Sequence, residues 1–226
     1  MEKKKYELCL EVLKRFQKAG ILDGLILIGS WSLYFYQYYF SHTDFTPSIR
    51  TRDLNFLVPL PSIIRQKTDI PELLKDLGFL LDFRGSKGYI KLQNPDLIVE
   101  FLVPERGRGT DKPYKLPNLG VNAQALRFLD FLADNIIKIK IDNMSIIVPH
   151  PAAFALHKLI IFKRRTKSEK AEKDKEQALM VIDYLIKTKA EAELKRTFNS
   201  MPKKWQNKVL DSLKSLDRLD IITLLG

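Results

Sequence analysis

Short apolar runs separated by turn residues dominate the first two thirds of the chain and predict a series of strands. A different spacing, with Leu8, Val12, Leu13 and Phe16 recurring every three or four residues, predicts an N-terminal helix. The expected strands cover residues 25–28, 52–58, 79–83, 89–92, 97–103, 136–141 and 145–148. The expected helices cover residues 4–19, 31–40 and 63–77, the last of them split by Pro71. The Pro- and Gly-containing segment 104–120 is predicted to be a loop.

The pattern changes after Pro149 and Pro151, where no further strand is predicted. Helical spacing predicts helices over 153–163, 176–187, 190–198 and 203–216, with a short helix at the end. The charged stretch KRRTKSEKAEKDKEQA, residues 163–178, is either the exposed start of a helix or a mobile loop. The sequence therefore predicts an α+β domain over residues 1–150 and an all-helical domain over residues 151–226.

Composition narrows the class of protein. The apolar content of 45% and the charged content of 29% are typical of a soluble globular protein. No apolar run reaches the ~18 residues of a membrane span, and the charged N-terminus does not resemble a secretory signal. Cys9 is the only cysteine, which excludes an intramolecular disulfide, and we expect a cytoplasmic location without membrane partners. The net charge of +11 modestly favours partners that carry phosphate over a merely solvated surface.

Gly29 and Ser30 join an apolar strand to an aromatic helix in the stretch LILIGSWSLYF. A helix that begins directly after a strand presents unpaired backbone N–H groups, and these bind phosphate. Glycine lets a phosphate approach the backbone closely, and serine adds a hydroxyl. The alternative is a structural turn in which Ser30 only caps the helix.

Acidic residues interrupt two of the predicted strands. Asp53 and Asn55 lie two residues apart in TRDLNFLV and so share one face of their strand, and Glu100 lies within LIVEFLV. A carboxylate in such a strand needs a partner, because burying an unpaired charge is costly. For Glu100 that partner is either a Lys or Arg side chain or a metal ion. Asp53 and Glu100 on adjacent strands are expected to bind Mg²⁺, which prefers oxygen ligands.

This order of motifs resembles the nucleotidyltransferase superfamily, whose members have the polymerase-β-like fold. The resemblance implies a mixed β-sheet with flanking helices, followed by helices. It also implies that Gly29 and Ser30 bind the triphosphate of an NTP substrate, while Asp53, Asn55 and Glu100 hold two metal ions, Mg²⁺ or Mn²⁺. Asp53 and Glu100 would then be catalytic. The reaction would transfer an NMP group to an acceptor such as an RNA, a protein side chain or a small molecule.

The second half of the chain resembles the bacterial and archaeal branch that includes type IV toxin nucleotidyltransferases. That resemblance implies nucleotide binding by Lys158, Arg165 and Lys173, with Arg164 as the alternative to Arg165, and a catalytic role for Asp174. It also implies a toxin–antitoxin type of partner. For Lys158 the alternative is a side chain whose stem packs in the core while its ammonium group stays in water.

One position departs from the family pattern, since Asn55 stands where an acid is expected. An amide binds Mg²⁺ more weakly than a carboxylate does. Three alternatives follow: catalysis with one well-held ion, replacement of the missing acid by Asp82, or a degenerate protein that binds nucleotide or nucleic acid without turnover. A further hypothesis is that the protein is a basic RNA-binding scaffold, in which case RNA binding would weaken steeply as the salt concentration rises.

Overall fold

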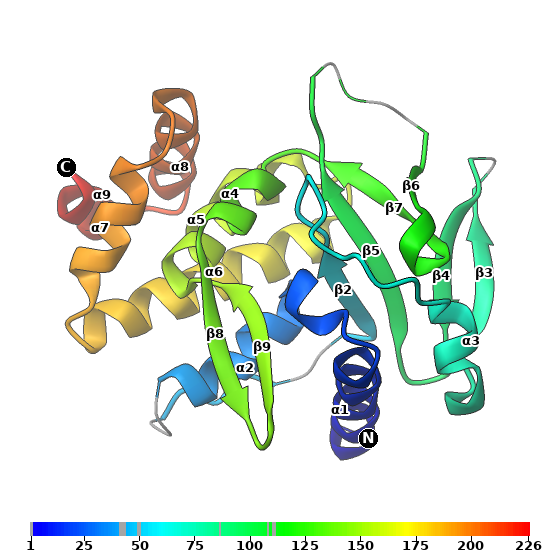
Figure 1. The fold of residues 1–226 in the computed structure, drawn as a ribbon. Coiled ribbons are helices and arrows are strands. Elements are labelled where there is room, and N and C mark those ends of the chain that lie inside the picture. The colour runs from blue at the N-terminus through cyan, green and yellow to red at the C-terminus, as the bar shows by residue number, and fades with distance from the viewer. Residues whose placement is uncertain (1, 41–43, 49–50, 86, 108, 110–111) are drawn as a thin grey trace. The chain divides into compact units, whose positions relative to one another are not determined.

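The computed structural model describes residues 2–40, 44–48, 51–85, 87–107, 109 and 112–226 (Figure 1). The chain forms two compact units, Met1–Pro149 and His150–Gly226. In the described part of the chain, no helix is both long enough and apolar enough to cross a membrane.

The first unit is organised around a mixed β-sheet. Its main strand order is β3-β4-β5-β2-β1-β9-β8, while β7 pairs with β5 and with β6. Strand β2 is antiparallel to β1 and parallel to β5, so the two strands with acidic residues are direct neighbours. The strands are β1 (Ile26–Ile28), β2 (Asp53–Leu57), β3 (Leu80–Arg84), β4 (Tyr89–Gln93), β5 (Ile98–Pro104), β6 (Tyr114–Leu116), β7 (Val121–Leu126), β8 (Ile136–Ile141) and β9 (Met144–Pro149).

Three helices of the first unit pack against this sheet, α1 (Glu2–Lys18), α2 (Ser30–Tyr39) and α4 (Leu129–Asp134), while α3 (Ile70–Leu74) contacts α1. Helix α1 buries its apolar stripe, and the ring of Phe16 lies 5.1 Å from Phe56 and 6.3 Å from Phe101. Because side chains alternate along a strand, the polar residues of β2 and β5 point to the opposite face. The packing of α1 thus leaves Asp53, Asn55 and Glu100 on the other face of the sheet.

The second unit contains helices joined by short turns: α5 (Pro151–Ile161), α6 (Ser168–Lys187), α7 (Glu191–Asn199), α8 (Lys203–Ser215) and α9 (Leu219–Leu225). Helix α5 is buried from Pro151 to Ile160 and is therefore the core helix of the unit. It begins at a His150 cap, whose Nδ1 accepts a hydrogen bond from the N–H of Ala152 at 3.2 Å.

The structure confirms the predicted fold class, a mixed sheet with flanking helices followed by helices. It also settles the charged stretch, because α6 begins at Ser168 and turns most of it into the start of a helix. Helix 63–77 is wrong in its first half, since α3 begins only at Ile70. Asp69 caps α3 by accepting from the N–H of Glu72 at 3.2 Å, and Pro71 lies in the first turn.

The loop predicted over 104–120 is partly wrong, since it contains β6, and the strand β7 that follows it escaped prediction. Strand β7 carries polar residues that weaken its apolar pattern, and one of them is used by the fold. The side chain of Asn122 accepts from the N–H of Ile90 and donates to the carbonyl of Gly88, both at 2.9 Å. Tertiary hydrogen bonds thus stabilise a strand that propensity alone does not favour.

Candidate functional site

The strand register brings Asp53, Asn55 and Glu100 together on one face of the sheet, and we call these three residues the polar row. Asn55 of β2 pairs directly with Glu100 of β5, and Asp53 pairs with Ile98. Paired residues of neighbouring strands share a face, and so do residues two apart on one strand. Asp53 and Glu100 therefore lie on one face of adjacent strands, diagonal to each other, with Asn55 between them.

Gly29 brings the strand–helix turn to the same row. It precedes α2, which begins at Ser30, and Ile28 of β1 pairs with Asn55. A methyl group added to Gly29 would lie 3.5 Å from Nδ2 of Asn55. The carbonyl of Gly29 accepts a hydrogen bond from Oγ of Ser32 at 2.7 Å, which fixes the turn. The start of α2 and the polar row therefore lie next to each other, on the central strands β1 and β2.

Glu100 has a cationic partner that the sequence motifs did not identify. Nζ of Lys91 on β4 forms an ion pair with Oε1 of Glu100, and both side chains are largely buried. The ion-pair alternative for Glu100 is therefore confirmed. No hydrogen bond or ion pair engages the Asp53 carboxylate within the part of the chain that the structure describes. A lysine interrupting the run YIKLQ was the available signal for this residue.

Asp82 is excluded as a substitute for the missing acid. It pairs with Lys91 across β3 and β4, and β4 and β5 separate it from the strand of Asp53. Three strand spacings of ~4.8 Å place it about 14 Å away across the sheet, too far to share one ion with Asp53. The alternative that Asp82 replaces the acid missing at position 55 is wrong.

The donor set of the row fits a hard divalent cation. Asp53, Asn55 and Glu100 offer oxygen atoms from two adjacent strands, and Mg²⁺ is bound in proteins by such groups. Within the described residues no three His, Cys, Asp or Glu side chains gather as a metal cluster. An ion here would therefore have to use the amide oxygen of Asn55 or take Glu100 from Lys91.

The second unit gathers three of its four predicted site residues. Asp174 of α6 is buried and forms ion pairs with Nζ of Lys158 on α5 and with Nε of Arg165, the latter at 2.6 Å. Burial raises the pKa of a carboxyl group, but the two cations outweigh this and hold the pKa of Asp174 below its ordinary value. The interpretation of Lys158 as a side chain with a hydrated ammonium is wrong, since only 9% of the side chain is exposed.

The neighbours of this cluster differ in how they contribute. Lys173 is half-buried on α6 beside Asp174, and Arg164 ends the turn after α5. His157 is buried, and burial together with the charge of Lys158 lowers its pKa to about 3, so the imidazole is neutral. Arg165 is the most exposed member of the ion-paired cluster, at 38%, and uses only Nε for Asp174. Its remaining N–H donors are the groups of the cluster best suited to an anion.

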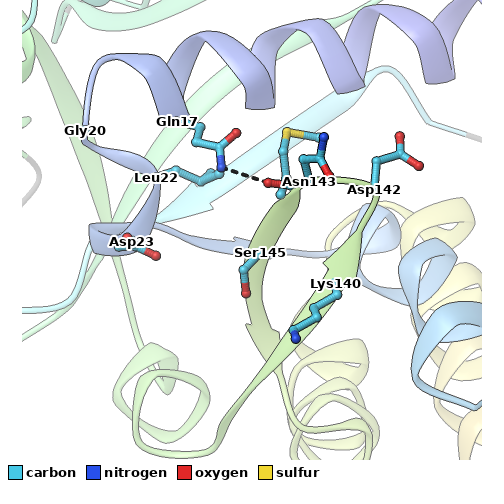
Figure 2. Close-up of a pocket in the computed structure, with 9 residues that line it drawn as sticks. Gln17, Gly20, Leu22, Asp23, Lys140, Asp142, Asn143 and Ser145 are labelled. Carbon is cyan, nitrogen blue, oxygen red and sulfur yellow. Dashed lines mark hydrogen bonds between the residues drawn. The ribbon is translucent and has the colours of Figure 1, made fainter.

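A cavity of about 370 Å³ lies elsewhere in the first unit (Figure 2). It lies between the end of α1 and the β8–β9 hairpin, where Nε2 of Gln17 donates to the carbonyl of Asn143 at 3.2 Å. Its lining residues Leu22 and Asp23 precede β1, whereas Gly29 follows that strand. None of the predicted site residues lines this cavity, so we do not assign it to the candidate site.

The backbone of Gly29 makes a testable contribution. Its φ of 77° and ψ of −152° belong to a region that only glycine adopts readily. We expect Gly29→Ala to weaken NTP binding, because the added methyl group reaches the row at Asn55, and to cost about 1–3 kcal/mol of stability.

The matched control for that experiment is Gly78→Ala, at a glycine of equal φ that caps a turn elsewhere in the sheet domain. Calorimetric titration with NTP and chemical denaturation should separate the two effects. Gly78→Ala should lower stability alone. Equal NTP affinity in wild type and Gly29→Ala would contradict the assignment of the turn.

Comparison with known proteins identifies the family. A sequence model described as a nucleotidyltransferase matches residues 7–203. Among solved structures, the antibiotic-resistance factor ANT(2'')-Ia is similar with a TM-score of 0.50 at 10% identity, over 97% of this chain and 98% of that one. An antigenic nucleotidyltransferase-like protein from Paracoccidioides brasiliensis is similar with a TM-score of 0.51 at 14% identity, over 97% and 92% of the two chains. No curated protein sequence matches significantly.

These two structural likenesses support the fold alone because their sequence identities are low. The family match is of a different kind, since it extends over most of the sequence and includes both the polar row and the ion-paired cluster. The chain belongs to the nucleotidyltransferase family.

Proposed function

We propose that the protein transfers an NMP group from an NTP to an acceptor, with Mg²⁺ bound at the Asp53 face of the sheet. The observation that carries this proposal is the position of Gly29 beside Asn55, on the strand that also carries the Asp53 carboxylate, which has no partner among the described residues. A phosphate-binding turn next to an oxygen-donor site is what positions an α-phosphate for in-line transfer. When bound, the ion would polarise the phosphoryl oxygens and neutralise developing charge.

The residues of the two units would have different roles in the reaction. Gly29 and Ser30 would bind phosphate oxygens through backbone N–H groups, and Asp53 with Asn55 would orient the ion. In the second unit Arg165, Lys158 and Lys173 would supply positive charge for the nucleotide. Asp174, predicted to be catalytic, is held ionised by two cations, and this favours a role in positioning Lys158 and Arg165.

The acceptor is proposed to be an RNA, because the net charge of +11 attracts a polyanion. A protein side chain or a small molecule is an outcome that the same experiment detects. One structural neighbour is named as an antibiotic-resistance factor, and 10% identity does not transfer its substrate to this chain. We also propose that the protein acts in the cytoplasm and has a partner protein of the toxin–antitoxin type.

The test incubates the purified protein with each of four NTPs labelled on the α-phosphate, together with Mg²⁺ or Mn²⁺. Total cellular RNA and total cellular protein serve as separate acceptors. We expect metal-dependent label in the RNA fraction from one NTP. Label in protein instead would change the acceptor, and binding of NTP with no transfer to any acceptor would contradict the enzymatic reading.

Asn55 and the Lys91–Glu100 ion pair favour a second candidate, a degenerate nucleotide-binding protein. The variant Asn55→Asp separates the two. If the protein is an enzyme limited by its metal site, the variant should equal or exceed wild-type transfer and need less Mg²⁺, because a carboxylate binds the ion better than an amide. Restored transfer in the variant from an inactive wild type would support the degenerate reading.

A further inference from the structure

Lys91 lies beside the polar row, and the family pattern does not explain it. Strands β3, β4, β5 and β2 place Asp82, Lys91, Glu100 and Asn55 at successive positions across the sheet. Lys91 is thus the cation of a row that ends at the phosphate-binding turn. Its ammonium contacts Glu100, and the two side chains are exposed by only 28% and 19%. Partial burial makes the pair stronger than an exposed one.

The two departures in this row compensate each other in charge. Three carboxylates holding two divalent ions leave one positive charge in total. Around the proposed ion, Asn55 removes one negative charge and Lys91 adds one positive charge. The carboxylates of Asp53 and Glu100, one ammonium group and one divalent ion then leave the same total. Asp82 is not part of this count, because it lies on β3, beyond Lys91 from the ion. A second divalent ion would raise the positive charge further, and Glu100 already has its counter-ion.

We propose that Lys91 replaces the second divalent ion, so that the site binds one ion through Asp53 and Asn55 while Glu100 holds the ammonium group in place. This inference rests on the proposed function and specifies its metal requirement. In this arrangement Lys91 is a positioning and charge-supplying residue, and Glu100 is its anchor. The neutral amide at position 55 then matches the charge of a site that binds a single divalent ion.

Counting bound Mn²⁺ by electron paramagnetic resonance tests the proposal without any turnover. Each sample contains the protein and a non-hydrolysable α,β-methylene NTP, and samples without protein correct for ions bound by the nucleotide alone. Wild type should bind one ion. Lys91→Met should bind Mn²⁺ at least about tenfold more tightly, because a neighbouring positive charge is lost and Glu100 becomes available. The double variant Asn55→Asp/Lys91→Met should bind two ions.

Two further variants distinguish charge from structure. Lys91→Arg keeps the positive charge and should retain one ion at wild-type affinity. Lys138→Met removes an exposed lysine from β8 of the same sheet and should leave binding unchanged. In transfer assays the Mg²⁺ dependence of kcat should become second order in Asn55→Asp/Lys91→Met and stay first order in wild type.

These measurements test the role of Lys91 separately from the proposed nucleotidyl transfer. Two ions of similar affinity in wild type, or unchanged Mn²⁺ affinity in a folded Lys91→Met, would overturn the role of Lys91 and leave nucleotidyl transfer standing. A wild type that binds neither NTP nor Mn²⁺ would overturn both. One ion in wild type and Lys91→Arg, with two in the double variant, would establish the replacement.

Discussion

Replacing Asp53 with Asn should reduce NMP transfer by about 10³-fold while the protein stays folded. The Asp53 carboxylate lies on the face of the sheet opposite α1, and none of the described residues forms a hydrogen bond or an ion pair with it. An amide would leave the site without its one unpaired negative charge. Loss of an ion's charge stabilisation is worth several kcal/mol in the transition state, and about 4 kcal/mol corresponds to this factor.

The measurement is kcat/KM for wild type and variant over a Mg²⁺ series, with NTP affinity determined separately in the absence of metal. That affinity should change little, because the phosphate contacts proposed for Gly29 and Ser30 would stay intact. Asp134→Asn, an exposed acid at the end of α4, is the matched control and should retain full activity. Equal rates of NMP transfer by wild type and Asp53→Asn would exclude a catalytic site on the face of the sheet that carries Asp53.

The sequence was sufficient to place Asp53, Asn55 and Glu100 on one face. Strand periodicity determines the face of each residue, and apolar flanks mark both strands as central. The contact of Glu100 with Lys91 was beyond that reasoning, because it depends on the register of the β4–β5 pairing. Register is a property of two strands and their turn, and no pattern within one strand specifies it.

For the ion-paired cluster of the second unit, the sequence likewise predicted the residues but not their contacts. Helical spacing predicted α5 and the later part of α6, and the family resemblance pointed to Lys158, Arg165 and Asp174. Their mutual ion pairs could not be predicted, because Lys158 and Asp174 lie 16 residues apart on different helices. Only the packing of α5 on α6 brings the ammonium group and the carboxylate together.

Asp174→Ala should lower the free energy of unfolding by about 3 kcal/mol or more, because it leaves the buried Lys158 ammonium without its counter-charge. Asp183→Ala is a matched control on the same helix. Asp183 pairs with Arg218 at 2.6 Å, but 53% of its side chain is exposed, so its loss should cost no more than about 1 kcal/mol. Urea denaturation of both variants gives the comparison, and similar losses would contradict a structural ion pair at Asp174.

The pH dependence of that loss identifies its cause. Burial lowers the pKa of Lys158, and removal of Asp174 takes away the charge that opposes this effect. Between the lowered pKa and the unfolded value of ~10.4, the unfolded chain binds more protons than the folded one, so stability rises with pH. The deficit of Asp174→Ala should therefore shrink between pH 7 and about pH 10, whereas that of Asp183→Ala should not. Adding Lys158→Met to Asp174→Ala should recover part of the stability at pH 7, since no buried lysine charge remains. A deficit that is constant with pH and unaffected by Lys158→Met would assign the loss to packing instead of charge.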